Sequence, residues 1–412
     1  MTDLAEPIAV DLFDPDTFVE GPPHEYLTHL RATQPVFRQA MAEGDDAWVV
    51  LRHADLVHVA REPNVFSASL GGVVIEDLDP EALAMMRHML LAMDPPPHAD
   101  YRAPLSPHFG ARVIGQLEGQ IRAICQRIMA EAAERGDVEF VHDVCGALPS
   151  QVVGEIMGLP EEDWGRIQRW AERQTSGQDP ELAAVGEDED ENAMVAMAMY
   201  FIEFGARRRS EPMREDLTSL ILATEFGRED RAPEPMSDID FGSFCVQLVT
   251  AGNDTTKTML SSGLQALLQH PDQLAALRDD PALIPGAVEE ILRWANPLHY
   301  FRRTASADTE LSGVPIAEGE KVAMYYTAAN RDEAVFADAQ AFDVRRNPNP
   351  HLSFGIGEHF CLGAHLARLE GRVFFEELLA AFPTIEQTGE AVRVRSNLNN
   401  ALKRLPIRLT PA

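Results

Sequence analysis

The sequence HLSFGIGEHFCLGAHLARLE occupies residues 351–370 and joins a glycine-rich loop to the start of a helix. Gly355, Gly357 and Gly363 allow tight turns around Cys361, because glycine tolerates backbone conformations that other residues avoid. Leucine and alanine then favour helix, so Cys361 is expected at a helix N-terminus. Amide dipoles at that end favour a thiolate, and a thiolate can bind a metal ion. A cysteine considered alone is more often an ordinary buried thiol.

The composition limits the classes of function. The four cysteines, Cys125, Cys145, Cys245 and Cys361, lie far apart without a Cys-x-x-Cys pair, which argues against a zinc ribbon, an iron–sulfur cluster or a disulfide framework. The formal net charge of -31 argues against binding to nucleic acid or to an anionic membrane surface. Neither a secretory signal nor an apolar run of membrane-spanning length is present, so a cytoplasmic location is expected.

A second landmark is a helical pattern that runs from Ser237 to His270 without an internal proline. Ser237, with Asp240 three residues later, predicts an N-cap. At about 1.5 Å per residue the helix would be roughly 50 Å long and would cross the whole molecule.

The middle of this helix reads Ala-Gly-Asn-Asp-Thr-Thr over residues 251–256, which is poor helix-forming sequence. Two interpretations stay open at this point. The threonine hydroxyls can simply bond back to the preceding turn. Alternatively, the small residues admit a flat cofactor, and Asp254 and Thr255 provide an acid and an alcohol for proton delivery.

Two more charged pairs have helical spacing. His98 and Arg102 follow a proline-rich segment and lie one turn apart, so they could hold a carboxylate together, although such pairs are usually solvated. Glu290 and Arg293 have the i, i+3 spacing of an ion pair on a helix predicted over residues 285–294.

In this order, the four segments resemble the motifs of the cytochrome P-450 family. Phe-Gly-x-Gly-x-His-x-Cys-x-Gly, complete from Phe354 to Gly363, is similar to the family's haem-binding loop, in which the cysteine thiolate is the axial iron ligand. His-x-x-x-Arg is similar to a propionate-binding pair, Ala-Gly-x-Asp-Thr-Thr to the oxygen-activating motif, and Glu-x-x-Arg to a pair that braces the haem loop.

The resemblance implies a b-type haem (heme b, with iron) and a set of site residues. Its cofactor contacts would be His98, Arg102, Ala251, Gly252, Arg303, Phe354, Gly355, His359, Cys361 and Gly363, with Cys361 as the metal ligand and Asp254 and Thr255 as the catalytic residues. Its candidate substrate contacts would be Val249, Asn253, Leu298, Phe301, Asn400 and Ala401, with Ala251, His299 and Tyr300 as further candidates. A third partner of the Glu290–Arg293 pair is expected, and Arg346 is a candidate because Ala341 stands where the family often has arginine.

The fold implied is that of the cytochrome P-450 family, mainly α with a small β region, as a single domain over residues 1–412. Hairpins are predicted from residues 36–38 and 48–51 and around Gly313, with a strand over residues 322–326 and more strands over residues 392–409. The helical region over residues 111–157 is expected to break at Gly136 and Pro149. The acidic run at residues 187–191 is typical of a solvated loop.

The function implied is that of an oxidoreductase, a monooxygenase that hydroxylates an apolar small molecule of terpenoid, fatty-acid or steroid type with O2. The chain has no flavin or nicotinamide fingerprint, so electrons are expected from a ferredoxin and its ferredoxin reductase. A basic patch of Arg102, Arg112 and Arg368 is the candidate docking site. The alternative is a non-catalytic gas sensor or electron carrier, which would need no acid–alcohol pair.

Overall fold

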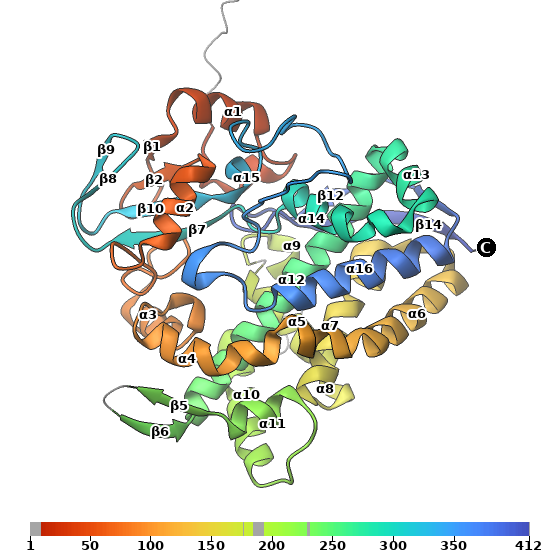
Figure 1. Cartoon of the computed structure of the whole chain (residues 1–412), viewed down its shortest axis with the longest axis horizontal. Helices are drawn as coiled ribbons and strands as arrows, with labels where there is room; N and C mark the ends of the chain where they lie inside the picture. Colours follow the sequence, from red (N-terminus) through yellow and green to blue (C-terminus); the bar gives the residue numbers. More distant parts are fainter. Residues whose placement is uncertain (1–9, 176, 184–192, 229–230, 412) are drawn as a thin grey trace, which may run out of the picture.

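The fold is arranged around one long helix, α12 (Asp238–Gln269), which passes through the centre of the molecule (Figure 1). Ser237 caps it as predicted, because its hydroxyl oxygen accepts the backbone N–H of Asp240 at 3.1 Å. Pro271 then begins α13 (Pro271–Asp279), so the helix ends where the sequence indicates. The computed structural model describes residues 10–175, 177–183, 193–228 and 231–411, and the acidic run at residues 187–191 lies outside them.

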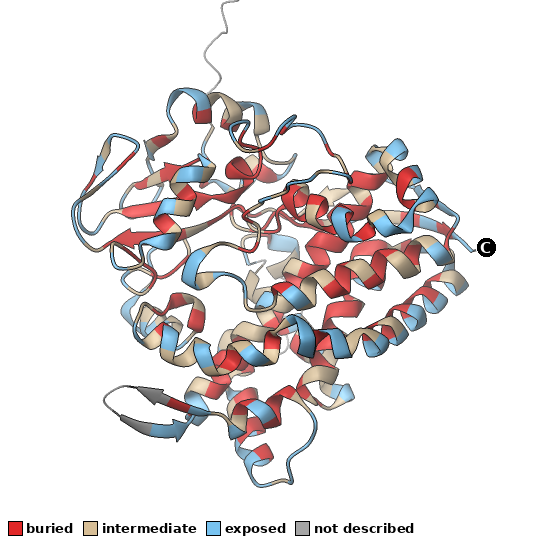
Figure 2. Cartoon of the chain, viewed as in Figure 1, coloured by how far each residue is buried: buried red, intermediate tan, exposed pale blue. Residues whose placement is uncertain are grey.

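Two hydrophobic clusters meet along α12. Its first half, from Phe241 to Val249, packs with apolar residues of α8 (Glu161–Thr175) and α10 (Ala193–Arg209). Its second half, from Met259 to Leu267, packs with α6 (Glu118–Arg135), α14 (Ile284–Ala295) and α16 (Ala364–Ala381). Figure 2 shows the resulting run of buried residues. The weak helical segment at residues 251–256 therefore lies where the two clusters join.

The remaining helices surround this core or cover the sheets. They are α1 (His24–Thr33), α2 (His53–Arg61), α3 (Pro80–Met86), α4 (Pro97–Leu105), α5 (Ala111–Ile114), α7 (Ala147–Met157), α9 (Pro180–Ala183), α11 (Leu217–Ala223) and α15 (Tyr326–Ala329). In the described part of the chain, no helix is both long and apolar enough to cross a membrane.

A five-stranded sheet with the order β1-β2-β10-β7-β3 forms the main β region. β2 is antiparallel to β1 and parallel to β10, and β10 is antiparallel to β7, with Met324 opposite Phe301. The predicted N-terminal hairpin, the strand near residue 322 and the Gly313 hairpin are all present. The strands are β1 (Val36–Gln39), β2 (Ala47–Val50), β3 (Phe66–Ser67), β4 (Asp137–Glu139), β5 (Glu225–Arg228), β6 (Arg231–Pro235), β7 (Tyr300–Ala305), β8 (Thr309–Leu311), β9 (Val314–Ile316), β10 (Lys321–Tyr325), β11 (Thr384–Gln387), β12 (Val392–Arg393), β13 (Leu402–Arg404) and β14 (Pro406–Thr410).

The break predicted at Pro149 is wrong. α6 does end at Gly136, whose φ of 71° suits glycine, but Pro149 is the third residue of α7. Proline is tolerated there, because N–H groups in the first turn have no helical partner to lose. The chain instead breaks earlier, at β4 and at a short π-helical segment, Val141–Cys145.

Candidate active site

The loop before α16 presents Cys361 next to the helix start. Gly355 and Gly357 have φ values of 67° and 76°, the left-handed region that glycine favours. A Cβ on Gly357 would also lie 2.6 Å from the carbonyl oxygen of Ala60 in α2, so this position has no room for a side chain. The backbone N–H of Cys361 donates to the carbonyl of Phe354 at 2.8 Å and closes the loop.

Gly363 was expected to allow a tight turn, but its backbone conformation does not require glycine. Its φ of -83° is accessible to any residue, and it is the N-cap of α16. Its backbone N–H points to the Cys361 sulfur and lowers the pKa of the thiol. Cys361 is exposed at the surface of the loop, whereas Cys125, Cys145 and Cys245 are buried.

The Cys361 thiol does not ionise easily among protein atoms alone. Although the residue as a whole is exposed, the protein atoms around its sulfur desolvate the thiol and raise its pKa above the usual value, and the Gly363 N–H, Arg102 and Arg368 only partly oppose this. The helix start thus favours the thiolate in the direction expected from the sequence, but the surrounding protein atoms outweigh it. A metal cation at the sulfur would supply the missing stabilisation, since a coordinating thiol is deprotonated.

Four basic side chains converge beside this loop, and we call them the cationic cluster: His98, Arg102, Arg303 and His359. The imidazole rings of His98 and His359 have centroids 4.3 Å apart. Arg102 donates from Nη2 to the carbonyl of Phe360 at 2.5 Å, and the buried Arg303 donates to the carbonyl of Arg302 at 2.8 Å. The structure thus brings together side chains from α4, β7 and the cysteine loop.

The cationic cluster lacks an anion. Nε2 of His98 and Nε2 of His359 are buried without a hydrogen-bond partner among the described residues. Burial, together with the neighbouring positive charges, lowers the pKa of His98 to about 4 and that of His359 to about 2. The nearby carboxylate of Asp94 already accepts the hydroxyls of Ser67 and Ser69. A ligand with anionic side groups fits these donors, so the residues present fit the haem that the sequence indicates.

The centre of α12 contributes the half-buried alcohol of Thr255. Thr255 donates from Oγ1 to the carbonyl of Ala251, one turn earlier, at 2.5 Å, so the back-bonding interpretation of this segment is correct as far as the hydroxyl proton is concerned. Ala251 itself is exposed. A Cβ on Gly252 would make ordinary contact with Val153 at 3.5 Å. The helix stays continuous through the segment.

Asp254 lies on the buried side of α12. Lys257 Nζ is 2.8 Å from Oδ1 of Asp254 and 2.9 Å from Oε1 of Glu172 in α8, and the Thr175 hydroxyl also donates to Asp254. Burial raises the pKa of Asp254, with Lys257 opposing that shift. The buried group of Asp254, Lys257 and Glu172 approaches the surface near His142, whose side chain is 42% exposed. Nδ1 of His142 lies 3.9 Å from Oε1 of Glu172.

The candidate substrate contacts differ in burial and in hydrogen-bond partners. Val249 and Ala401 are buried, and Leu298 and Phe301 are half-buried. Asn253 accepts the Ser150 hydroxyl at 3.0 Å and so faces α7. Asn400 donates to the carbonyls of Ala295 and Asn296. The further candidates His299 and Tyr300 are also buried, with His299 bonded to Thr327.

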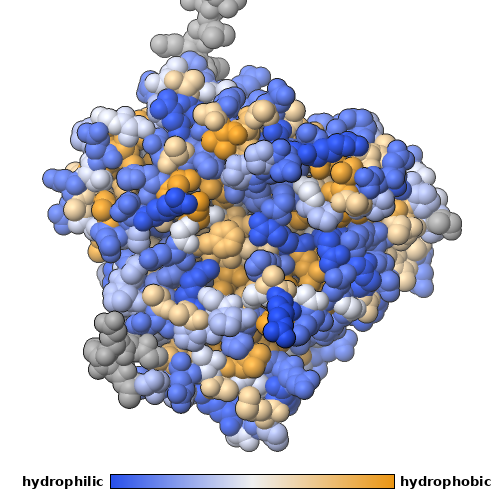
Figure 3. Space-filling model, in the orientation of Figure 1, coloured by the Kyte–Doolittle hydropathy of each residue, from blue (hydrophilic) through white to orange (hydrophobic). Residues whose placement is uncertain are grey.

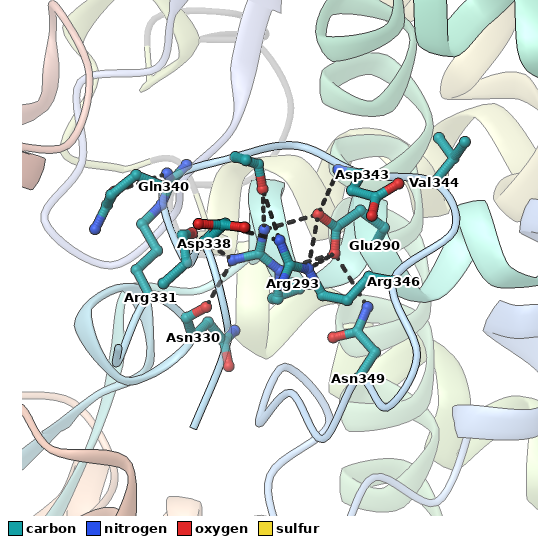
Figure 4. Close-up of polar contacts among 12 residues, drawn as sticks. Glu290, Arg293, Asn330, Arg331, Asp338, Gln340, Asp343, Val344, Arg346 and Asn349 are labelled. Atoms are coloured by element: carbon teal, nitrogen blue, oxygen red, sulfur yellow. Dashed lines mark hydrogen bonds and ion pairs between the residues drawn. The ribbon is translucent and has the colours of Figure 1, made fainter. Parts of the chain in front are cut away.

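The loop is braced from behind by a buried ionic network (Figure 4). Arg293 donates to both carboxylate oxygens of Glu290, at 2.8 and 2.7 Å, and to the carbonyl of Ala341 at 2.8 Å. Arg346 is 3.1 Å from Oε2 of Glu290 and is the third partner that the sequence left open. Asn349, two residues before the cysteine loop, donates to the same oxygen.

Three charged residues near the site were not predicted from the sequence. Lys257 and Glu172 surround Asp254, and Glu370 of α16 is buried with a hydrogen bond from Thr256. The i, i+3 spacing of Asp254 and Lys257 could have indicated their pairing. No local signal distinguishes Glu370 from a surface glutamate, because its burial comes from packing against α12.

The comparisons with known proteins agree with this geometry. A family model described as Cytochrome P450 matches residues 189–410. The steroid C26-monooxygenase of Mycolicibacterium smegmatis is 35% identical over 416 aligned residues, which cover 98% of this chain and 95% of that protein. The methyl-branched lipid omega-hydroxylase of Mycobacterium bovis is 37% identical, over 88% of this chain and 84% of that protein.

Solved structures show the same fold. Mycobacterium marinum cytochrome P450 CYP268A2, in complex with pseudoionone, matches with a TM-score of 0.87 and 33% identity, over 99% of this chain and 100% of that one. CYP109E1 from Bacillus megaterium, in complex with testosterone, matches with a TM-score of 0.82 and 27% identity, over 94% and 97%. The predicted mainly helical fold is confirmed. Because the relatives are named as a monooxygenase and a hydroxylase, the chain is an enzyme and not a gas sensor or an electron carrier. The chain belongs to the cytochrome P450 family of haem-dependent monooxygenases.

Proposed function

We propose that this monooxygenase hydroxylates an apolar molecule of terpenoid, fatty-acid or steroid type, with electrons from a ferredoxin that is reduced by a ferredoxin reductase. The observation that carries the proposal is the cationic cluster beside Cys361. It offers buried donors without a protein carboxylate to satisfy them, next to a single presented sulfur. That combination suits a metal-bearing ligand with anionic side groups.

In this proposal Cys361 binds the haem iron through its sulfur. His98, Arg102, Arg303 and His359 hold the propionates, and charge-assisted hydrogen bonds of this kind are about twice as strong as neutral ones. When bound, the haem supplies the iron that activates O2 and accepts the two electrons of the reaction. Phe354 supports the loop, because the Arg368 guanidinium stacks over its ring at 4.5 Å.

In this proposal, Asp254 and Thr255 of α12 deliver the protons. Because the Thr255 hydroxyl gives its own proton to the Ala251 carbonyl, its oxygen remains able to accept a hydrogen bond on the exposed side of the helix. Asp254 holds a proton more readily than an ordinary aspartate, because burial raises its pKa. We infer that Asp254 is the acid and Thr255 the positioning alcohol for the two protons consumed in each turnover.

The substrate class rests on two kinds of support. Leu298 and Phe301 are half-buried and so keep apolar contact surface, which suits an apolar molecule. The relatives named above are a steroid C26-monooxygenase and a methyl-branched lipid omega-hydroxylase, and the solved relatives hold pseudoionone and testosterone. We therefore extend the class of steroid, branched-lipid and terpenoid substrates to this chain.

A compound screen tests the substrate proposal. The holoenzyme is titrated with steroids, branched fatty acids and terpenoids while the haem Soret band is recorded, and positive compounds are incubated with NADH, a surrogate ferredoxin and its reductase. Hydroxylated product from at least one class is expected. Soret shifts without product from any of the three classes would contradict the proposal.

We propose a smaller docking site for the ferredoxin than the three arginines that the sequence indicated. Arg368 forms a bidentate pair with Glu289, at 2.7 and 2.9 Å, which cancels its charge. Arg102 is half-buried within the cationic cluster. Arg112, in α5 against α16, is exposed and has no ion pair within the described residues. In Figure 3 the face that carries the cysteine loop has apolar surface near its centre, bordered by hydrophilic side chains. We propose Arg112 as the principal charged contact.

A further inference from the structure

A polar cavity of about 230 Å³ lies between the N-terminal segment, α12 and the C-terminal strands. We call it the junction cavity. His24, Ser262, Arg331, Arg393 and Asn400 are among its lining residues. Ser262 is seven residues beyond Thr255, about 10 Å along the helix axis. Neither the cysteine loop nor the cationic cluster lines this cavity, although Asn400, one of the candidate substrate contacts, does.

Two arginines in the cavity wall have no carboxylate partner among the described residues, in contrast to the buried arginines Arg293 and Arg208. Arg293 and Arg208 each pair with a carboxylate, at 2.7 and 2.8 Å. Arg331 is only 6% exposed, yet its polar contact is a 3.3 Å hydrogen bond to the Gln340 amide oxygen. Its guanidinium carbon lies 3.7 Å from the centroid of the Trp294 ring. Arg331 forms no ion pair within the described parts of the chain.

Arg393, in β12, is half-buried and also lacks a counter-charge. It donates from Nη1 to the Asn400 amide oxygen at 2.9 Å, and the described residues give it no carboxylate partner. Burial alone lowers the pKa of Arg393. Keeping a charge without a partner costs free energy of folding when the charge is buried, as at Arg331, and less when it is half-buried, as at Arg393, so an anion that reaches both groups would stabilise the protein.

The electrostatics of the cavity are dominated by positive charge. Burial lowers the pKa of His24 to about 2, and Arg331 and Arg393 both add to that shift. Burial, and then the nearby Arg293, lower the pKa of Arg331 to about 9. Glu20, the carboxylate in the cavity wall, is exposed. This local excess of cations stands out in a chain whose formal net charge is -31.

A hydroxyl group completes the set of donors. Ser262 lines the cavity, is 7% exposed, and has an Oγ without a hydrogen-bond partner among the described residues. Guanidinium groups match the geometry of oxyanions and bind them through paired N–H groups. Donors that approach from α12, from β12 and from the segment after α15 suit a ligand with acceptor oxygens in several directions, as in a tetrahedral phosphate.

We propose that the junction cavity binds a phosphate-type oxyanion, either free phosphate or the phosphate group of a small metabolite. Arg331 and Arg393 supply the charge, and Ser262 supplies a neutral donor. None of the residues proposed to contact the haem lines this cavity.

Calorimetric titration of the holoenzyme with inorganic phosphate tests the proposal, with sodium chloride used to hold the ionic strength constant. The key variant is Arg393→Gln, and the matched control is Arg395→Gln. Arg395 lies two residues further on, pairs with Asp16, and is not a cavity-lining residue, so its loss removes the same charge without touching the site. His24→Gln tests a second wall of the cavity.

Saturable phosphate binding by the parent is expected, at least about tenfold weaker in Arg393→Gln, weaker in His24→Gln, and unchanged in Arg395→Gln. Tighter binding of glycerol 3-phosphate than of inorganic phosphate would assign the site to a phosphate monoester, and the reverse order to free phosphate. Absence of saturable binding by the parent overturns the proposal. So does an affinity that Arg393→Gln and His24→Gln leave unchanged.

Discussion

Arg346 donates from Nε to Oε2 of Glu290 at 3.1 Å, although the two residues are 56 positions apart in the chain. The same carboxylate binds Arg293, and the side chains of Glu290 and Arg293 are fully buried. One buried carboxylate thus holds two guanidinium groups behind the cysteine loop. Removal of the carboxylate leaves both charges without a partner, whereas removal of Arg346 leaves the inner pair intact.

We therefore expect Glu290→Gln to lower the free energy of unfolding by about 3–5 kcal/mol, and Arg346→Gln to lower it by clearly less. Urea unfolding of the holoenzyme, followed by the Soret band and by circular dichroism, measures both values. Arg345→Gln is the control, because Arg345 is exposed. Equal losses for Glu290→Gln and Arg346→Gln would show that the inner pair is not the stabilising unit.

Replacement of Cys361 by His is expected to abolish the thiolate-type spectrum of the reduced carbon monoxide complex. The reason is that Cys361 is the exposed cysteine, whereas Cys125, Cys145 and Cys245 are buried. Cys125→Ala is the matched control and is expected to keep the spectrum. An unchanged spectrum in Cys361→His would remove this residue as the iron ligand.

Thr255→Ala is expected to retain haem and substrate binding while the yield of product per NADH falls severalfold and peroxide accumulates. The variant loses the hydroxyl that faces the exposed side of α12, and general acid catalysis typically contributes about 10²–10⁴-fold. Thr250→Ala removes a hydroxyl one turn earlier, which is bonded to Gln174 instead, and is expected to resemble the parent. A parental product yield in Thr255→Ala would place the proton path elsewhere.

Glu370 predicts a pH dependence of stability. Burial raises the pKa of its carboxyl from 4.5 to about 8, so the folded state binds a proton that the unfolded state releases. The stabilisation from this proton is complete below pH 4.5 and is lost as the pH rises toward 8. Relative to the parent, Glu370→Gln should gain about 1.4 kcal/mol per pH unit across this window, because glutamine does not titrate.

Denaturant unfolding of the parent and Glu370→Gln at pH 5, 6, 7 and 8 measures this difference. Glu386→Gln, at an exposed position in β11, is the control and should give a flat difference. A flat difference for Glu370→Gln as well would mean that Glu370 is ionised in the folded protein.

Charge reversal at Arg112 is expected to slow the first electron transfer from a ferredoxin at low salt and to weaken its salt dependence, with substrate affinity unchanged. Stopped-flow reduction of the holoenzyme measures the rate. Arg368→Gln is the comparison and should have a smaller effect, since Glu289 already neutralises Arg368. Parental rates in Arg112→Glu at low salt would remove Arg112 from the docking surface.

The sequence by itself determined the parts of this protein that depend on local pattern. The long helix could be predicted from its cap at Ser237 and the proline at position 271, and the cysteine loop from glycines whose positive φ values follow from residue type. The family motifs carried the reaction class, because each is a short run of residues with its own chemistry. The helix break predicted at Pro149 was wrong, because the local sequence does not distinguish a proline in the first turn of a helix from one that ends a helix.

Only the tertiary structure decided which distant residues meet. Glu172 joins Lys257, and Arg331 and Arg393 line one cavity, yet neither association has a sequence signature. Arg346 was only a candidate partner of Glu290 until the structure showed the contact. Burial decided the electrostatics too. The raised pKa of Glu370 comes from the loss of water around its carboxyl, which packing imposes and local sequence does not encode.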